Sequence, residues 1–126
     1  MAFGRETVAA NIKPLEGSII RRYTAGAAIA VGELVSMSSD GFIDPSDSTA
    51  AKNPVLGVSV QAATAAGQRL DVVVFGPVRC LIDATPGGLI YNSTTAGEPL
   101  ETTAGNQTIA GLAESATVLF VRPALA

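Results

Sequence analysis

The sequence contains no histidine and no tryptophan, and Cys80 is its single cysteine among 126 residues. Without histidine, Ser-His-Asp triads, Cys-His pairs and imidazole metal ligands are excluded. One cysteine cannot form an intramolecular disulfide, so the fold is not stabilised by internal crosslinks. Charged residues make up 15% of the chain and aromatic residues 5%. We therefore expect no enzyme, no cofactor and no metal site.

Long hydrophobic runs and basic clusters are also missing. A membrane-spanning helix needs about 20 apolar residues, and the best run, Val72 to Phe75, has four. The first six residues lack the apolar stretch of a signal peptide, so we expect synthesis in a cytoplasm. With 8 basic and 11 acidic residues the net charge is −3. Because phosphate contacts require clustered Lys and Arg, we expect no nucleic-acid partner, and no membrane partner either.

What the sequence does have is small and apolar residues. Alanine (21), glycine (13), valine (12) and threonine (11) are the commonest types, and 48% of the chain is hydrophobic. The high apolar fraction and low charge argue against disorder. A chain of this length buries roughly two-thirds of its unfolded surface, which is enough for one core. We expect one folded domain.

Short apolar runs separated by glycine and proline predict an all-β fold, a small β-barrel or sandwich. Asp40-Gly41 is typical of a tight hairpin turn, Asp44-Pro45 is a turn signal, and Gly76-Pro77 is expected to end a strand. No window of eleven or more residues has the spacing of an amphipathic helix. The predicted strands are 18–23, 34–37, 42–43, 55–60, 70–75, 78–82, 89–91, 109–113 and 117–121.

One pattern occurs twice. A strand that begins near Leu34 is followed by a polar loop and a strand carrying Gly57, and a strand near Leu89 is followed by a loop and a strand carrying Gly111. The offsets are 55 residues from Leu34 to Leu89 and 54 from Gly57 to Gly111. Either the chain contains two halves of a pseudo-symmetric barrel, or the match is a coincidence in a sequence rich in Ala, Gly and Thr. Two copies are too few for a solenoid.

Residues 1–17 are the least regular part of the chain. Pro14 prevents a continuous strand or helix, so we interpret the segment as an extended N-terminal arm that precedes a domain at 18–126; a disordered tail is the alternative. Residues 1–22 carry a charge of +2 and the remainder −5. The basic pair Arg21-Arg22 is a candidate interface with an acidic surface, unless the asymmetry arose by chance.

Acidic clusters offer two weak candidate sites. Asp40, Asp44 and Asp47 could hold a cation, but no Glu follows at the position that closes a calcium loop, so turn formation is the better interpretation. Glu98 and Glu101 could form a carboxylate pair, yet nothing nearby would separate their pKa values. We expect these two to lie on a solvated loop.

Two other motifs have structural explanations. Cys80 alternates with Val78 and Ile82, and with no histidine to activate it we expect a buried, inert thiol. Gly87-Gly88 is not followed by Gly-Lys-Ser/Thr or by a helix, so it predicts a turn and not a phosphate loop.

The placement of glycine and small residues resembles a known family. The chain is similar, over roughly residues 25–122, to the capsid decoration (head cement) proteins of tailed bacteriophages. Members share a pattern of Gly-x-Leu-Val, hydrophobic-Gly-hydrophobic and Ala-Gly-x-x-Val-x-Val segments. The matching segments here are 32–35, 53–59, 66–68, 72–78 and 111–121.

This resemblance implies a compact β-tulip domain with an extended N-terminal arm. It also implies a homotrimer on the outside of the expanded head, at local threefold sites, that clamps neighbouring copies of the major capsid protein against the pressure of packaged DNA. The arm would add strand pairing on the capsid, with Phe3 and Ile12 as apolar anchors, and its deletion (residues 2–14) would leave a folded trimer that no longer binds heads. The capsid-binding arm implied in this way consists of Ala2, Phe3, Gly4, Arg5, Ile12, Lys13 and Pro14.

Two other kinds of function remain open. A small β-barrel can hold a ligand or glycan in its mouth, although the absence of tryptophan is unfavourable for stacking sugars. Another virion component, such as a fibre base or a head–tail adaptor, would have a similar composition. The loop at 38–52 could have a further partner, such as a cell-surface glycan.

Overall fold

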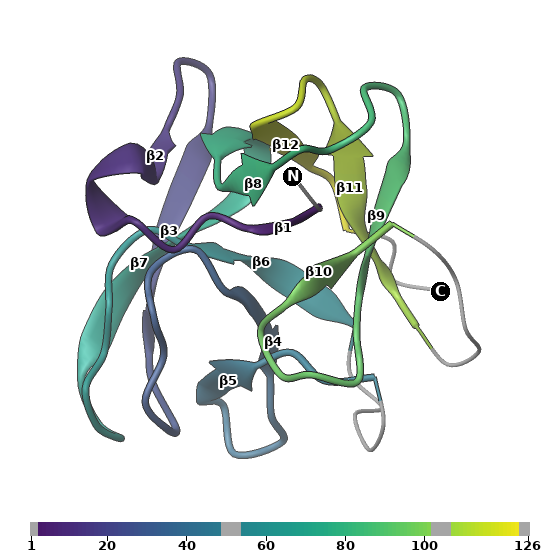
Figure 1. The fold of residues 1–126 in the computed structure, drawn as a ribbon. Coiled ribbons are helices and arrows are strands. Elements are labelled where there is room, and N and C mark those ends of the chain that lie inside the picture. The colour runs from purple at the N-terminus through teal and green to yellow at the C-terminus, as the bar shows by residue number, and fades with distance from the viewer. Residues whose placement is uncertain (1–2, 49–53, 102–106, 124–126) are drawn as a thin grey trace.

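The computed structural model describes residues 3–48, 54–101 and 107–123. These residues form strands and one short 3-10 turn, so the predicted all-β class is confirmed (Figure 1). The elements are β1 (Gly4–Arg5), η1 (Ala9–Asn11), β2 (Lys13–Pro14), β3 (Ile19–Thr24), β4 (Leu34–Met37), β5 (Ile43–Pro45), β6 (Val55–Ser59), β7 (Arg69–Arg79), β8 (Leu81–Ile82), β9 (Leu89–Asn92), β10 (Pro99–Leu100), β11 (Ile109–Ala113) and β12 (Val118–Val121).

Most strands belong to one curled antiparallel sheet that forms a half-barrel. Its order is β10-β9-β11-β12-β7-β6-β4-β5, with β2 and β3 also paired to β7. The sheet curls far enough for backbone hydrogen bonds to link its two ends: Leu34 N donates to Gly97 O (3.0 Å) and Gly97 N donates to Ser46 O (2.8 Å). The predicted small barrel-like domain therefore agrees with the observed architecture.

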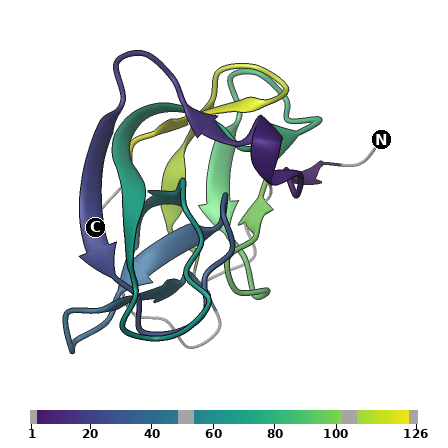
Figure 2. The same ribbon diagram turned by 90° about the vertical axis from the view of Figure 1, so that its left-hand side faces the viewer.

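Strand β7 is the centre of the sheet. Its first half lies between β3 and β6, and its second half lies between β2 and β12; Figure 2 shows β3 along the outer side of β7. The expectation that Gly76-Pro77 ends this strand is wrong. Gly76 takes a φ of +106°, which glycine adopts without strain, and Pro77 stays in register opposite Phe120. The strand turns at this point and continues.

Other strand boundaries differ in smaller ways. The turn expected at Asp44-Pro45 lies within β5, where Pro45 pairs with Val35. The hairpin turn at Asp40-Gly41 is present, with Ser38 N donating to Phe42 O (2.8 Å) and Gly41 at φ +86°. Strands β1, β2 and β10 were not predicted, because two residues are too few to show an alternating pattern.

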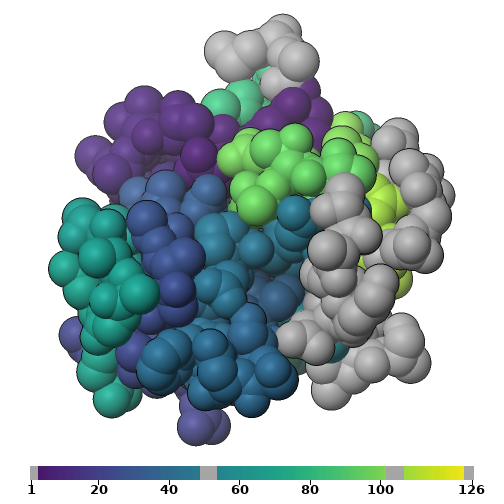
Figure 3. Space-filling model, turned by 90° about the horizontal axis from the view of Figure 1, so that it is seen from below, coloured from purple at the N-terminus to yellow at the C-terminus, as the bar shows by residue number. Residues whose placement is uncertain are grey.

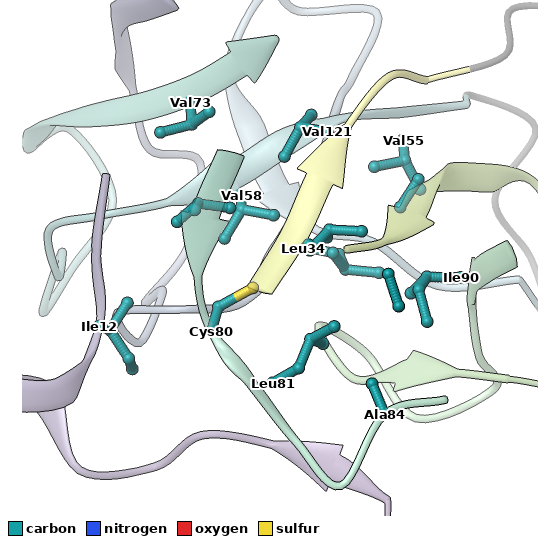
Figure 4. Packing of buried hydrophobic residues seen from close by; sticks show 14 residues of the cluster. Ile12, Leu34, Val55, Val58, Val73, Cys80, Leu81, Ala84, Ile90 and Val121 are labelled. Carbon is teal, nitrogen blue, oxygen red and sulfur yellow. The ribbon is translucent and has the colours of Figure 1, made fainter. Parts of the chain in front are cut away.

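The core consists of two clusters on opposite sides of the sheet. The larger one fills the inside of the curl (Figure 4). The smaller one lies outside β4, β6 and β7, where Ala25, Ile29 and Ala63 cover Val35 and Val72. The segments that carry Ile29 and Ala63 pair through an isolated bridge, and Figure 3 shows these loops (dark blue and teal) side by side on the surface.

The predicted repeat is present in the topology. Strand β4 pairs with β6, and β9 pairs with β11, and in each pair the register shifts close to the glycine of the repeat. The two copies expose different faces, however. Leu34 and Val58 of the first copy are buried in the larger cluster, whereas the matching Leu89 and Leu112 are 44% and 39% exposed. Because Leu34 pairs with Val58 just as Leu89 pairs with Leu112, the register is the same in both copies, and the two strand pairs instead turn opposite faces toward the larger cluster.

A buried polar network joins the two copies. The side-chain amide of Asn92 donates to Ser46 Oγ (3.0 Å), and Asn92 Oδ1 accepts a hydrogen bond from Thr108 N (2.9 Å). Ser36 Oγ and Ser46 Oγ lie 2.8 Å apart. Because each of these buried groups has a partner, the network fixes one arrangement of the two halves.

Candidate functional site

The segment predicted to be an arm, here called the N-terminal strap (residues 3–17), lies against the barrel. Strand β1 pairs with β8, and β2 pairs with β7. Glu6 N donates to Cys80 O (2.9 Å) and Leu15 N donates to Pro77 O (3.0 Å). Ile12 is buried in the larger core cluster, and Phe3 packs against the same cluster. The two proposed capsid anchors thus serve the chain's own core, and Ala2 lies outside the described residues.

An ion pair between Arg5 and Glu98 links the strap to the second repeat. The Arg5 Nε lies 2.6 Å from Glu98 Oε2, and the guanidinium also donates to Val31 O (3.1 Å). Burial raises the pKa of nearby Glu33, while a hydrogen bond from Ala30 N and the charge of Arg5 lower it. Glu98 lies on the loop before β10, as expected, but its side chain is 34% exposed and paired with Arg5 instead of being fully solvated.

The remaining acidic candidates have structural roles. Glu101 accepts a hydrogen bond from Thr85 N (2.7 Å), while Glu98 pairs with Arg5. Asp40 accepts a hydrogen bond from Phe42 N (2.9 Å), which agrees with turn formation, whereas Asp44 lies in strand β5 and accepts one from Ser38 Oγ (2.5 Å). Within the described ranges, no three His, Cys, Asp or Glu side chains are grouped closely enough to hold a metal ion.

Cys80 is buried in the middle of the larger cluster, as predicted (Figure 4). Burial raises the pKa of its thiol to about 12, and the charge of Arg5 opposes this only in part. Little thiolate is therefore present at neutral pH, which disfavours a role of this thiol as a nucleophile.

This burial gives a direct chemical prediction. At pH 8 the native protein should react with an aromatic disulfide reagent at least a hundredfold more slowly than the urea-unfolded chain, because a thiol of unperturbed pKa is far more ionised at that pH. The release of the coloured thiol, followed by absorbance, measures both rates. Equal rates would show that Cys80 is accessible in the folded state.

The basic pair lies on the outer strand β3. Arg21 and Arg22 are both exposed, and Arg22 reaches Asp71 on the neighbouring strand (3.2 Å). An exposed pair of this kind contributes at most about 1 kcal/mol to stability. The two arginines remain a predicted interface, and the strap residues Lys13 and Pro14 form β2, which also pairs with β7.

A row of apolar side chains, all exposed except the half-buried Phe120, crosses the outer side of the sheet, and the sequence did not predict it. Adjacent members are opposite one another on paired strands or in ring contact: the rings of Phe75 and Phe120 meet edge to face, 5.2 Å between centroids at 81°. This outer apolar row consists of Ile19, Phe75, Phe120, Leu112 and Leu89.

The second-repeat end of the row forms a groove of about 560 Å³. Glu114 and Arg122, both exposed, stand at this groove beside Leu112 and Phe120. An alternation of polar and apolar residues in the sequence could have indicated exposed positions here. Which face these side chains occupy depends on how the β9–β11 pair is oriented in the sheet, which the sequence does not reveal.

A second exposed apolar spot lies on the β4–β5 hairpin. Phe42 is 41% exposed and Met37 is 36% exposed. The hairpin is at the bottom of Figure 1, whereas β12 is at the top. The domain therefore presents two separate apolar surfaces, the outer apolar row and this hairpin tip.

Comparison with known proteins does not identify the chain: no model of a protein family matches it, and no curated protein matches it either. The part of the chain that the structure describes has no helix with the length and apolarity needed to cross a membrane.

Proposed function

We propose that this protein is a structural component of a bacteriophage virion that binds the outer surface of the expanded head. In this proposal it acts as a trimer at local threefold sites and clamps neighbouring major capsid proteins against internal DNA pressure. The observation that supports it best is the outer apolar row. Its side chains lie outside the two buried core clusters, so the domain's own core does not account for them. Together with the resemblance over residues 25–122, this favours a protein that works through contacts with other proteins.

The chemistry of the surface supports protein contact over other binding. Contiguous apolar patches on small domains mark interaction sites, and the net charge of −3 is unfavourable for contact with phosphates. A linking protein needs one surface for its own copies and another for the shell, and the outer apolar row and the hairpin tip provide two. The buried thiol and the hydrogen-bonded carboxylates are better suited to structure than to catalysis.

Binding through several copies explains how weak contacts hold a shell. In a trimer, the second and third attachments occur at high effective concentration, so total affinity exceeds that of one copy. Selectivity for the expanded head requires a site that the unexpanded particle does not present. The N-terminal strap contributes through its exposed Val8 and Lys13, while Phe3, Arg5 and Ile12 hold it in place.

Co-sedimentation tests this function. The purified protein should bind expanded heads that lack it, saturating near one trimer per local threefold site, and should not bind unexpanded procapsids. Phe42→Asp should weaken binding about tenfold or more, because a charge replaces apolar surface that the shell would bury. Ser39→Asp is the matched control, since it adds the same charge to an exposed polar position of the same hairpin. Absence of binding to both particles would contradict the proposal.

A further inference from the structure

We propose that the outer apolar row is the contact between copies of this chain, so that its occupant is a second copy. A second copy would be the partner of one of the two apolar surfaces, and this assignment rests on the proposed function. The row runs from Ile19 on β3 to Leu89 on β9, across β7, β12 and β11.

The chain covers the outer side of the sheet along the first repeat but leaves it exposed along the second. Outside β4, β6 and β7, the chain covers its own apolar side chains with Ala25, Ile29 and Ala63, which are at most 2% exposed. Outside β9, β11 and β12, Leu89 and Leu112 are 44% and 39% exposed. Apolar side chains on the outer side of the sheet are thus covered by the chain along the first repeat. Along the second repeat they form an apolar face that another molecule can cover.

The charges beside the row fit a second copy. Glu114 and Arg122 both line the groove that Leu112 and Phe120 share. When two or three identical surfaces meet around a symmetry axis, an acidic group of one copy can lie against the basic group of the next. A strongly acidic or basic partner would instead be matched by charges of one sign.

The size and rigidity of the row also suit contact between copies. Four of its side chains are 39–53% exposed and Phe120 is half-buried, so the row leaves on the order of 300 Å² of apolar surface in water, given 150–250 Å² for a whole aromatic side chain. A stable interface buries about 800 Å² per partner, so the row would be its apolar centre and β3 with the charged groups its rim. Phe75 and Phe120 already hold each other edge to face, so little rotamer freedom is lost on contact.

The oligomeric state of the purified protein, measured without heads, tests the inference. Analytical ultracentrifugation should show a wild-type oligomer and a monomer for Leu112→Asp, with both proteins equally folded by circular dichroism, because Leu112 is already 39% exposed. Phe42→Asp is the matched control: it removes an apolar side chain of similar exposure, 41%, from the hairpin tip and should leave the oligomer intact.

A charge reversal gives a second, independent readout. Glu114→Arg and Arg122→Glu should each weaken self-association about tenfold, and the double variant should restore it, because the pair between copies is re-formed with opposite signs. A wild-type monomer above about 100 μM, where a contact of micromolar Kd would be occupied, would overturn the inference. So would an oligomer that persists in Leu112→Asp. Loss of head binding by an intact oligomer would instead count against the proposed function alone.

Discussion

Replacing Gly57 or Gly111 by alanine should severely destabilise the domain. A Cβ atom on Gly57 would lie 2.1 Å from the backbone oxygen of Val73, and one on Gly111 would lie 2.0 Å from that of Phe120. Both obstacles are backbone atoms of a paired strand, so no side-chain rotation relieves the overlap. The strands must separate, which would remove hydrogen bonds at the centre of the sheet. We expect a loss of several kcal/mol, a large part of the 5–15 kcal/mol that stabilises a typical domain.

Urea unfolding followed by circular dichroism measures this effect, with expression in inclusion bodies as the extreme result. Gly4→Ala is the matched control, because a Cβ there meets nothing within 4 Å. Its midpoint should stay close to that of the wild type. If Gly57→Ala or Gly111→Ala also unfolded at the wild-type midpoint, the close approach of these strands would not exist in solution.

The sequence was most informative where strands are long enough to alternate. Leu34–Met37 and Ile109–Ala113 were predicted with their observed bounds. The repeat, recognised from spacing alone, corresponds to two strand pairs with the same connection. Strands of two residues could not be predicted, because they exist only through their pairing partners.

The surface was harder to predict than the strands. Leu34 and Leu89 look equivalent in the sequence, yet one is 1% and the other 44% exposed. The register of the two strand pairs is the same, so the difference arises from which face each pair turns toward the larger core cluster, and this orientation in the sheet cannot be read from the strand sequences alone. The strap was misjudged for a related reason: its irregular sequence suggested a free arm, although Ile12 fills a gap in the core that is visible only in three dimensions.

This docking changes the expected result of shortening the N-terminus. Deletion of residues 2–14 should destabilise the domain, rather than leave it intact as a free arm would. Truncation of Ile12 alone to alanine should lower the free energy of unfolding by about 2–5 kcal/mol, as for other buried isoleucines. The deletion should cost more, since it also removes the pairing of β1 and β2 and the ion pair of Arg5 with Glu98.

Thermal or urea unfolding gives the size of the loss, and Cys80 reports where the loss occurs. The strap covers this thiol, with Glu6 N bonded to Cys80 O and Ile12 in the same cluster. Its reaction with a thiol reagent should therefore accelerate in the deletion variant under conditions where the rest of the sheet stays folded. Val8→Ala is the control, because Val8 lies on the strap and is 54% exposed, so stability and thiol protection should not change. A truncated protein of wild-type stability with Cys80 still protected would mean that the strap leaves the domain in solution and is free to bind elsewhere.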